Sequence, residues 1–184
     1  MNNTFLAIFP NEESNHKIRK VIGEIGRVFE GEQISVRWCK PENIYIEVFD
    51  FGNINFIKKQ LILFKLKKEK FLTFNISLLE CKLGLNRKYK DLVFLALDKG
   101  ADELRDIVFS LRGRFKTKDI SQFIPHISIG RVNKDLTAQE YTNLLTDIRN
   151  INKKLKIKDI KFEANEIFLV KREGDNLKVI TSFK

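Results

Sequence analysis

Helical and strand-like periodicities alternate along this chain of 184 residues, and only short links separate them. Residues 4–9 form an apolar run that ends at Pro10, which predicts a short buried strand. Apolar residues then recur at helical spacing up to Gly31, which predicts an amphipathic helix. Two further strands are expected over residues 34–38 and 44–49.

The rest of the chain continues this mixture. A second helix is expected over about 53–68, with Ile57, Leu61 and Phe64 on one apolar stripe. The remaining predicted elements are strands over 71–83, 92–97 and 123–132, helices that begin at 101 and after Thr137, and a C-terminal hairpin with its turn at 173–176. Short links favour antiparallel pairing, so we predict an α+β fold rather than a doubly wound parallel sheet.

Length and composition restrict the class of protein. A chain with 43% hydrophobic and 32% charged residues suits one folded domain, here spanning residues 1–184, with a sizeable core. No apolar run reaches the roughly 18 residues of a membrane span, and the N-terminus does not resemble a secretory signal. Cys39 and Cys81 form no CxxC pair, which argues against a disulfide framework and a zinc site. We therefore expect a cytoplasmic protein without a membrane partner.

The formal net charge is +10, which favours a polyanionic partner, nucleic acid first. The sequence contains no P-loop, no GxGxxG motif after a strand, no HExxH motif and no GxSxG nucleophile elbow. Its carboxylates are scattered and do not indicate a two-metal site. We therefore expect no metal and no organic cofactor.

The chain has two histidines, and they lie in different contexts. His126 begins the segment HISIGRV, where strand alternation places His126 and Ser128 on one face. That pair is suited to a phosphate, because both side chains can donate hydrogen bonds and histidine can also transfer a proton. Arg131 would add a charged contact, although strict alternation places it on the opposite face. His16 lies off the apolar stripe of the first helix and is expected on the surface.

Five segments together resemble a known family over nearly the whole chain. These are TFLAIFP, RWCKPENIYIEVFDFG, DLVFLALDKG, FIPHISIGRV and the closing EIFLVKREG…VITSFK. They are similar to the 2H phosphoesterases, in particular the 2′-5′ RNA ligase-like proteins that act as RNA 2′,3′-cyclic phosphodiesterases. The resemblance implies a two-lobed, pseudo-symmetric fold in which antiparallel sheets line a central groove and helices lie outside. Each lobe of that family contributes one H-x-[ST]-x strand to the groove.

One of the two motifs departs from the family pattern. His126 and Ser128 match the second motif, but Tyr45 and Glu47 stand where the first motif has histidine and threonine. By alternation Phe49 shares the face of Tyr45, where it would stack on a base, although core packing is the other interpretation. The resemblance thus implies His126, Ser128, Tyr45 and Glu47 as the catalytic set, with Arg131 and Phe49 as phosphate- or RNA-binding residues.

Three functions remain open at this point. The first is metal-free hydrolysis of a cyclic phosphate at an RNA end to a 2′-phosphate, weakened or altered by the changed motif. In it, either Glu47 is the base and His126 the acid, or Tyr45 is the acid and His126 the base. The second is a non-catalytic module that binds RNA or a nucleotide with a terminal phosphate, and the third is a stable domain with a lapsed site. A monomer is expected in each case.

Overall fold

The computed structural model describes residues 3–86, 89–117 and 122–184. Within these ranges the α-helices are α1 (Glu12–Gly31), α2 (Phe56–Leu66), α3 (Ala101–Phe115) and α4 (Ala138–Lys154). The strands are β1 (Thr4–Ile8), β2 (Val36–Trp38), β3 (Ile46–Gly52), β4 (Phe74–Leu83), β5 (Leu92–Lys99), β6 (His126–Val132), β7 (Lys161–Ala164), β8 (Ile167–Glu173) and β9 (Asn176–Phe183). Two short 3-10 helices, η1 (Pro41–Asn43) and η2 (Ile157–Asp159), complete the described chain.

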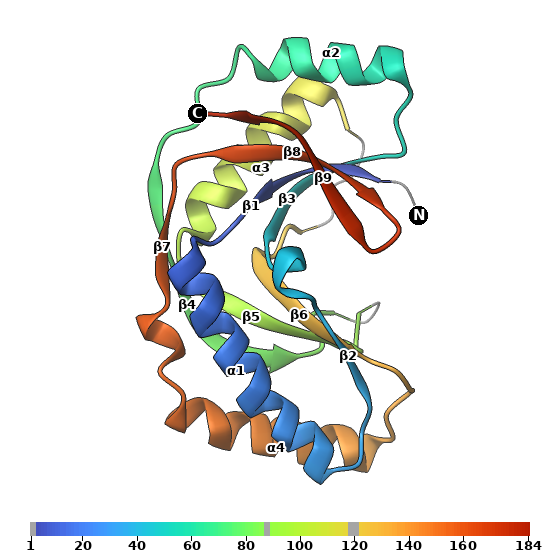
Figure 1. Cartoon of the computed structure of the whole chain (residues 1–184), viewed down its shortest axis with the longest axis vertical. Coiled ribbons are helices and arrows are strands. Elements are labelled where there is room, and N and C mark those ends of the chain that lie inside the picture. Colours follow the sequence, from blue (N-terminus) through green and yellow to red (C-terminus); the bar gives the residue numbers. More distant parts are fainter. Residues whose placement is uncertain (1–2, 87–88, 118–121) are drawn as a thin grey trace.

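The strands form one curved antiparallel sheet made of two halves (Figure 1). The order is β7-β4-β5-β6-β3-β1-β8-β9, and β2 pairs with β6 off this path. The halves join at the centre through β3 and β6, whose ladder is the single pair Ile46–Ile127. Because the ladder is this short, the two central strands separate on either side of it. The sheet is therefore continuous but behaves as two lobes that meet at one point.

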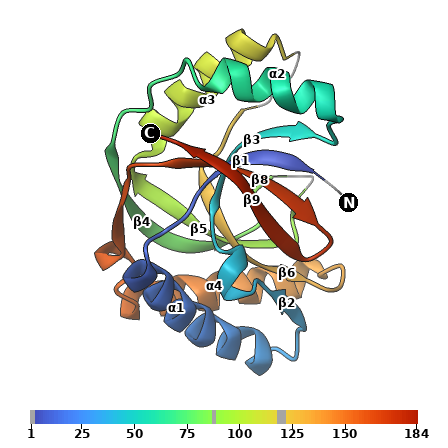
Figure 2. The same cartoon turned by 45° about the horizontal axis from the view of Figure 1, so that its top comes forward.

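Two helices cover the outside of each half (Figures 1 and 2). Helices α1 and α4 pack against each other at the β4–β5–β6 half, while α3 packs against β3 and β5 with α2 beside it. Side chains start these helices: Asn11 and Asn55 cap α1 and α2, and Thr137 forms a capping box with Glu140 at α4. The predicted α+β fold with antiparallel sheets and outer helices is confirmed.

The elements follow the predicted order with shifted ends. Residues 41–43 form a 3-10 turn, and β3 runs from Ile46 to Gly52, later than expected from the sequence. The C-terminal hairpin turns where predicted, and Gly174 there has a φ of 64°, in the left-handed region that favours glycine. Ile57, Leu61 and Phe64 share one side of α2 as predicted, but that side faces solvent, and Ile62 and Leu66 on the other side are buried.

A bulge in β3 changes which side chains share its faces. Ala7 of β1 pairs with Glu47, but Leu6 pairs with Phe49, so β3 carries one extra residue between them. Phe49 is therefore turned to the core side, where its ring lies 5.9 Å from that of Phe115 on α3. The predicted placement of Phe49 beside Tyr45 is wrong for this reason.

A second bulge does the same in β6. Ser128 pairs with Phe94 of β5 and Gly130 pairs with Val93, which leaves Ile129 as the extra residue. Gly130 then faces the core, where an added Cβ would lie 2.7 Å from the ring of Trp38. Arg131 consequently joins the face of Ser128. The expectation from strict alternation, which put Arg131 on the isoleucine face, is wrong.

Candidate active site

The residues of the two motif positions meet at the centre of the sheet. Ile46 and Ile127 pair directly, and both side chains are fully buried on the core side. Their neighbours in the chain point to the opposite face, which we call the site face. Tyr45 and Glu47 flank Ile46, and His126 and Ser128 flank Ile127, so all four lie on the site face beside this one pair. That the four residues act together stays a prediction.

His126 is held in one tautomer by the backbone. Its Nδ1 lies 2.7 Å from the carbonyl oxygen of Ile124, and since a carbonyl only accepts, Nδ1 carries the proton. The Nε2 atom is then left with its lone pair. Burial lowers the pKa of His126, and the charge of Arg131 lowers it further, while the hydrogen bond to Ile124 acts in the opposite direction. A neutral imidazole with a free Nε2 is suited to accept a proton.

Ser128 and Arg131 lie along the same strand. The half-buried hydroxyl of Ser128 has no hydrogen-bond partner within the described part of the chain, so it is available to a ligand. Arg131 Nη1 forms an ion pair with Asp91 at 2.9 Å, and its guanidinium lies 5.4 Å from the centre of the Tyr89 ring. These contacts orient the arginine and leave its side chain 40% exposed.

Tyr45 is set into an aromatic cluster. Its ring stacks on Phe5 with centroids 5.3 Å apart, and Phe9 lies 5.7 Å away on the same cluster. The phenolic oxygen accepts a hydrogen bond from Nη2 of Arg172 on β8. Burial raises the pKa of Tyr45 to about 12, against the opposing charge of Arg172. Tyr45 therefore keeps its proton at neutral pH.

Glu47 has a mixed electrostatic environment. The side chain of Glu47 is 45% exposed, and its partial desolvation raises the pKa of the carboxyl group, as does the charge of Asp50. Asp50 lies near Glu47 because the β3 bulge places Asp50 opposite Phe5 on the site face. Arg172 counteracts both effects, with Nη2 lying 4.0 Å from Oε2 of Glu47.

Three arginines converge on this face. Arg37 of β2 pairs across the sheet with Arg131, and both share the site face. Arg172 reaches the same face from β8, where it contacts Tyr45. Cys39 follows directly after β2, and burial raises the pKa of its thiol while the charges of Arg131, Arg172 and Arg37 all lower it. Such a face is suited to bind a phosphate group.

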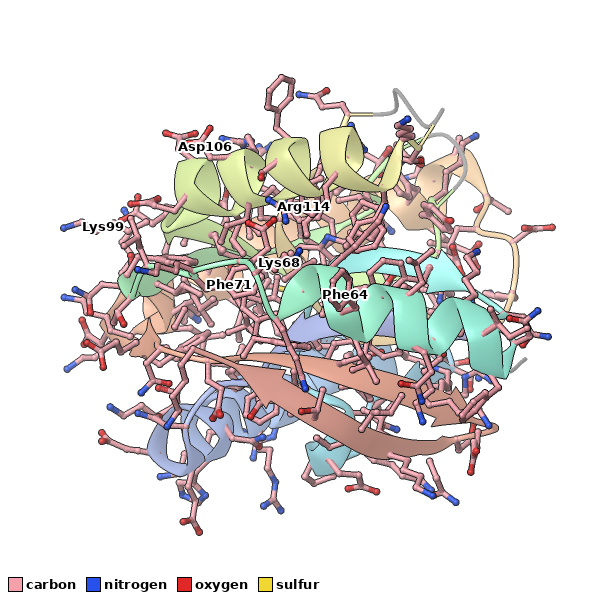
Figure 3. All side chains as sticks on the ribbon, turned by 90° about the horizontal axis from the view of Figure 1, so that it is seen from above. Phe64, Lys68, Phe71, Lys99, Asp106 and Arg114 are labelled. Carbon is pink, nitrogen blue, oxygen red and sulfur yellow. The ribbon has the colours of Figure 1, made fainter. Side chains whose placement is uncertain are left out.

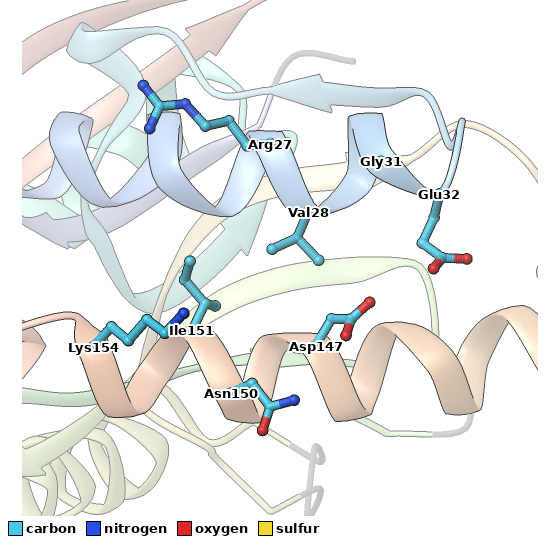
Figure 4. Close-up of a pocket in the computed structure, with 8 residues that line it drawn as sticks. All are labelled: Arg27, Val28, Gly31, Glu32, Asp147, Asn150, Ile151 and Lys154. Atoms are coloured by element: carbon cyan, nitrogen blue, oxygen red, sulfur yellow. The ribbon is translucent and has the colours of Figure 1, made fainter.

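The arrangement offers no metal site among the residues that the structure describes, where no group of three His, Cys, Asp or Glu side chains comes together. A separate pocket of about 360 Å³ opens between α1 and α4, lined by residues such as Arg27 and Asp147 (Figure 4). None of its lining residues lies on the site face. The candidate site is thus a set of side chains on the open sheet.

Comparison with solved structures identifies the fold. E. coli LigT complexed with phosphate superposes with a TM-score of 0.70 at 15% identity, over 99% of this chain and 96% of LigT. TT0787 of Thermus thermophilus gives 0.73 at 14% identity, over 98% and 96% of the two chains. Kluyveromyces marxianus Usb1 gives 0.62 at 14% identity, over 97% and 96%. The chain has the 2H phosphoesterase fold. No family model and no curated protein matches its sequence.

Three residues around the site of this 2H phosphoesterase fold were not predicted from the sequence. The charges of Arg172 and Asp50 both shift the pKa of Glu47. Phe94 packs edge-on against His126, with ring centroids 5.4 Å apart. Asp50 was hidden by the bulge, and Arg172 lies 127 positions along the chain from Tyr45, which it contacts. The sequence did show that Arg172 lies in the segment KRE before the turn of the closing hairpin, and this was the one signal that could have identified it.

Proposed function

We propose that this chain hydrolyses a 2′,3′-cyclic phosphate at an RNA end to a 2′-phosphate, by metal-free acid–base catalysis. The main support is the pairing of Ile46 with Ile127, because the neighbours of these two residues, His126, Ser128, Tyr45 and Glu47, lie on one face. The arginines around that face support a phosphate as the bound group. The sequence resemblance to RNA 2′,3′-cyclic phosphodiesterases supports the reaction type.

The solved neighbours support a phosphate-containing ligand. E. coli LigT has been solved with phosphate, with 3′-AMP, with ATP and with NADP⁺. A structure named only as a phosphoesterase has the same fold, with a TM-score of 0.68 at 13% identity. By analogy, this chain would bind the terminal phosphate and ribose of an RNA or nucleotide.

The proton roles follow from the protonation states. His126 is the general base, because its lowered pKa keeps it neutral and its Nε2 is free. It takes a proton from water as the water oxygen attacks phosphorus. The bond between phosphorus and the ribose 3′-oxygen breaks, and that oxygen needs a proton. Tyr45 supplies it, because its phenol is protonated at neutral pH.

Arg172 prepares Tyr45 for this role. It donates its hydrogen bond to the phenolic oxygen, so the phenolic proton remains free to point at a ligand. As the proton leaves, the guanidinium stabilises the phenolate that forms. Deprotonated Tyr45 and protonated His126 then exchange protons with solvent before the next turnover.

The changed first motif weakens the proposed reaction. An ionised Glu47 repels a phosphate where threonine would donate a hydrogen bond, and Arg172 offsets that repulsion in part. The Ser128 hydroxyl and the Arg131 guanidinium remain as hydrogen-bond donors to the phosphate. General acid–base groups contribute about 10²–10⁴ in rate each, and a phenol of high pKa is less effective than a histidine near neutral pH.

The test is hydrolysis of a short RNA that ends in a 2′,3′-cyclic phosphate, in the presence of a chelator. His126→Ala removes the base, and His16→Ala is the matched control because His16 is an exposed histidine on α1. The proposal requires a 2′-phosphate product that disappears in His126→Ala and persists in His16→Ala. An equal rate in the two variants would refute it.

A binding module is the second candidate, favoured by one observation. Tyr45 and Glu47 are both engaged by Arg172, so the first motif has contacts of its own. In this case the same RNA binds with a salt-dependent affinity but is released unchanged. Binding without turnover, lost on Arg131→Gln, would select this function over hydrolysis.

A further inference from the structure

Helix α2 exposes large apolar side chains to solvent, whereas a surface helix of a globular domain normally exposes polar ones. Phe56, Ile57, Leu61 and Phe64 are between 53% and 78% exposed, and they form what we call the α2 patch. On a helical projection these four residues occupy one continuous arc, interrupted only by Gln60. The opposite side, Ile62 and Leu66, is buried. The helix thus has apolar residues on two opposite sides, and an exposed apolar patch of this kind is typical of an interaction site.

Lysines border this patch. Residues 53–68 contain no acidic residue, and lysines stand at positions 58, 59, 65, 67, 68 and 70. The next acidic residue along the chain, Glu69, is paired with Arg114 of α3. Figure 3 shows Lys68 and Phe71 beyond the C-terminal end of α2, with Arg114 reaching from α3 alongside.

Not every lysine is free to meet a partner. Lys65 donates a hydrogen bond to the backbone oxygen of Arg114 and lies over the Phe115 ring, so it points toward α3. Lys68 instead lies 4.3 Å from the centre of the Phe64 ring, at the edge of the patch. Lys67 and Lys68 are exposed and continue the patch with positive charge.

We propose that the α2 patch binds the surface of an anionic lipid bilayer. A helix with phenylalanine and leucine in the centre and lysines at the border matches the chemistry of a membrane interface, where apolar groups enter the acyl boundary and lysines meet phosphate headgroups. Within the described residues no helix is long and apolar enough to cross a membrane. The 11 residues of α2 therefore lie on the bilayer and do not span it.

Other occupants fit these observations less well. A second copy of the chain would bring the lysine border of one α2 against that of the other, and like charges repel. Single-stranded RNA would stack on Phe56 and Phe64, but the aliphatic Ile57 and Leu61 offer it no stacking surface. An anionic bilayer uses both the aromatic and the aliphatic side chains. This proposal departs from the sequence-based expectation of no membrane partner, which rested on the lack of an apolar run long enough to span a bilayer.

Flotation with vesicles tests the proposal on the full chain. Phosphatidylcholine vesicles with phosphatidylserine should carry the protein upward, and vesicles of phosphatidylcholine alone should do so at least tenfold less. Leu61→Ser with Phe64→Ser should abolish flotation. Lys67→Gln with Lys68→Gln should weaken it by about fivefold for each lysine removed.

Matched variants control for folding and for general charge. Phe109→Ser removes an 80% exposed phenylalanine from α3, and Lys20→Gln with Lys153→Gln removes two lysines from α1 and α4, at the other end of the molecule. These variants should float like the native chain, and circular dichroism should show that all variants are folded.

Three results would overturn the membrane proposal. The first is equal flotation with neutral and anionic vesicles, or none with either. The second is a dimer in light scattering that Phe64→Ser converts to a monomer, which would make the patch a self-interface. The third is a loss of single-stranded RNA binding in Phe64→Ser without vesicle binding by the native chain. Because none of these measurements uses turnover, the result is independent of the proposed hydrolysis.

Discussion

Arg172 of β8 donates a hydrogen bond to the phenolic oxygen of Tyr45, which directly precedes β3 and lies far from Arg172 in the sequence. The same guanidinium lies 4.0 Å from Glu47, so one arginine contacts both residues that replace the family's first motif. It also lies over the ring of Phe5, at 5.2 Å from its centre. The substituted motif therefore forms a connected cluster with its own cation, and this cluster can be tested residue by residue.

Replacing Arg172 with glutamine should reduce turnover of the cyclic phosphate by about 10- to 100-fold, the value of one or two charge-assisted hydrogen bonds. Without Arg172 the pKa of Tyr45 rises further, and the charge of Glu47 is no longer offset. The measurement is kcat/KM. Lys171→Gln is the control, because Lys171 is the next residue of β8 and points to the other face. Equal rates for the two variants would contradict the role of Arg172.

The pH dependence separates the two possible proton donors. With His126 as base, the rate should rise through a pKa below about 6.5, because burial lowers the pKa of this histidine. If Tyr45 donates the proton, the rate then stays level through neutral and mildly alkaline pH, since its pKa is about 12. If His126 were the donor and Glu47 the base, the rate would rise through the pKa of the Glu47 carboxyl group and fall again as pH rises through the pKa of His126. A bell-shaped profile that loses its rising limb in Glu47→Gln would make Glu47 the base and His126 the proton donor.

The sequence predicted the order of the elements, because helices, strands and turns depend on local patterns, whereas the catalytic set was implied by the family resemblance and stays a prediction. Helical stripes, caps and the turn around Gly174 are read from neighbouring residues. The motif pair His126 and Ser128 needs only strand alternation to share a face. Their meeting with Tyr45 and Glu47 was predicted from the resemblance, and the Ile46–Ile127 pair provides the geometry.

Features that depend on pairing between distant strands could not be predicted from the sequence. One extra residue in β3 and one in β6 reverse the faces that follow them, which turns Phe49 inward and Asp50 and Arg131 outward. Alternation has no signal for such a bulge when the bulged residues are themselves apolar. The sequence also did not reveal which side of α2 is buried, because this helix carries apolar residues on two opposite sides.

Gly130 should tolerate no side chain. A Cβ there would lie 2.7 Å from the Trp38 ring and 2.9 Å from Val36, and Trp38 is itself packed edge-on against Phe29. We expect Gly130→Ala to lower the free energy of unfolding by about 1–3 kcal/mol, the usual cost of overpacking a core. Urea denaturation measures it.

Gly23→Ala is the matched substitution, and we expect it to change the free energy of unfolding in the opposite direction. Gly23 lies inside α1, and a Cβ there would meet nothing within 4 Å. Alanine should raise the free energy of unfolding by about 0.5–1 kcal/mol through helix propensity. If both variants were neutral, the close packing of β6 on Trp38 would not be a feature of the folded protein in solution.

Glu47→Thr should strengthen substrate binding, because it removes a carboxylate from the phosphate site and restores a hydroxyl donor. We expect KM for the cyclic phosphate to fall by about tenfold, which corresponds to about 1.4 kcal/mol. The native protein should show the same gain in part as pH falls through the raised pKa of Glu47, since the protonated carboxyl no longer repels the ligand. In Glu47→Thr this pH dependence of KM should vanish, whereas Glu42→Thr on the exposed η1 turn should retain it. A KM that rises in Glu47→Thr would show instead that the carboxylate binds the substrate.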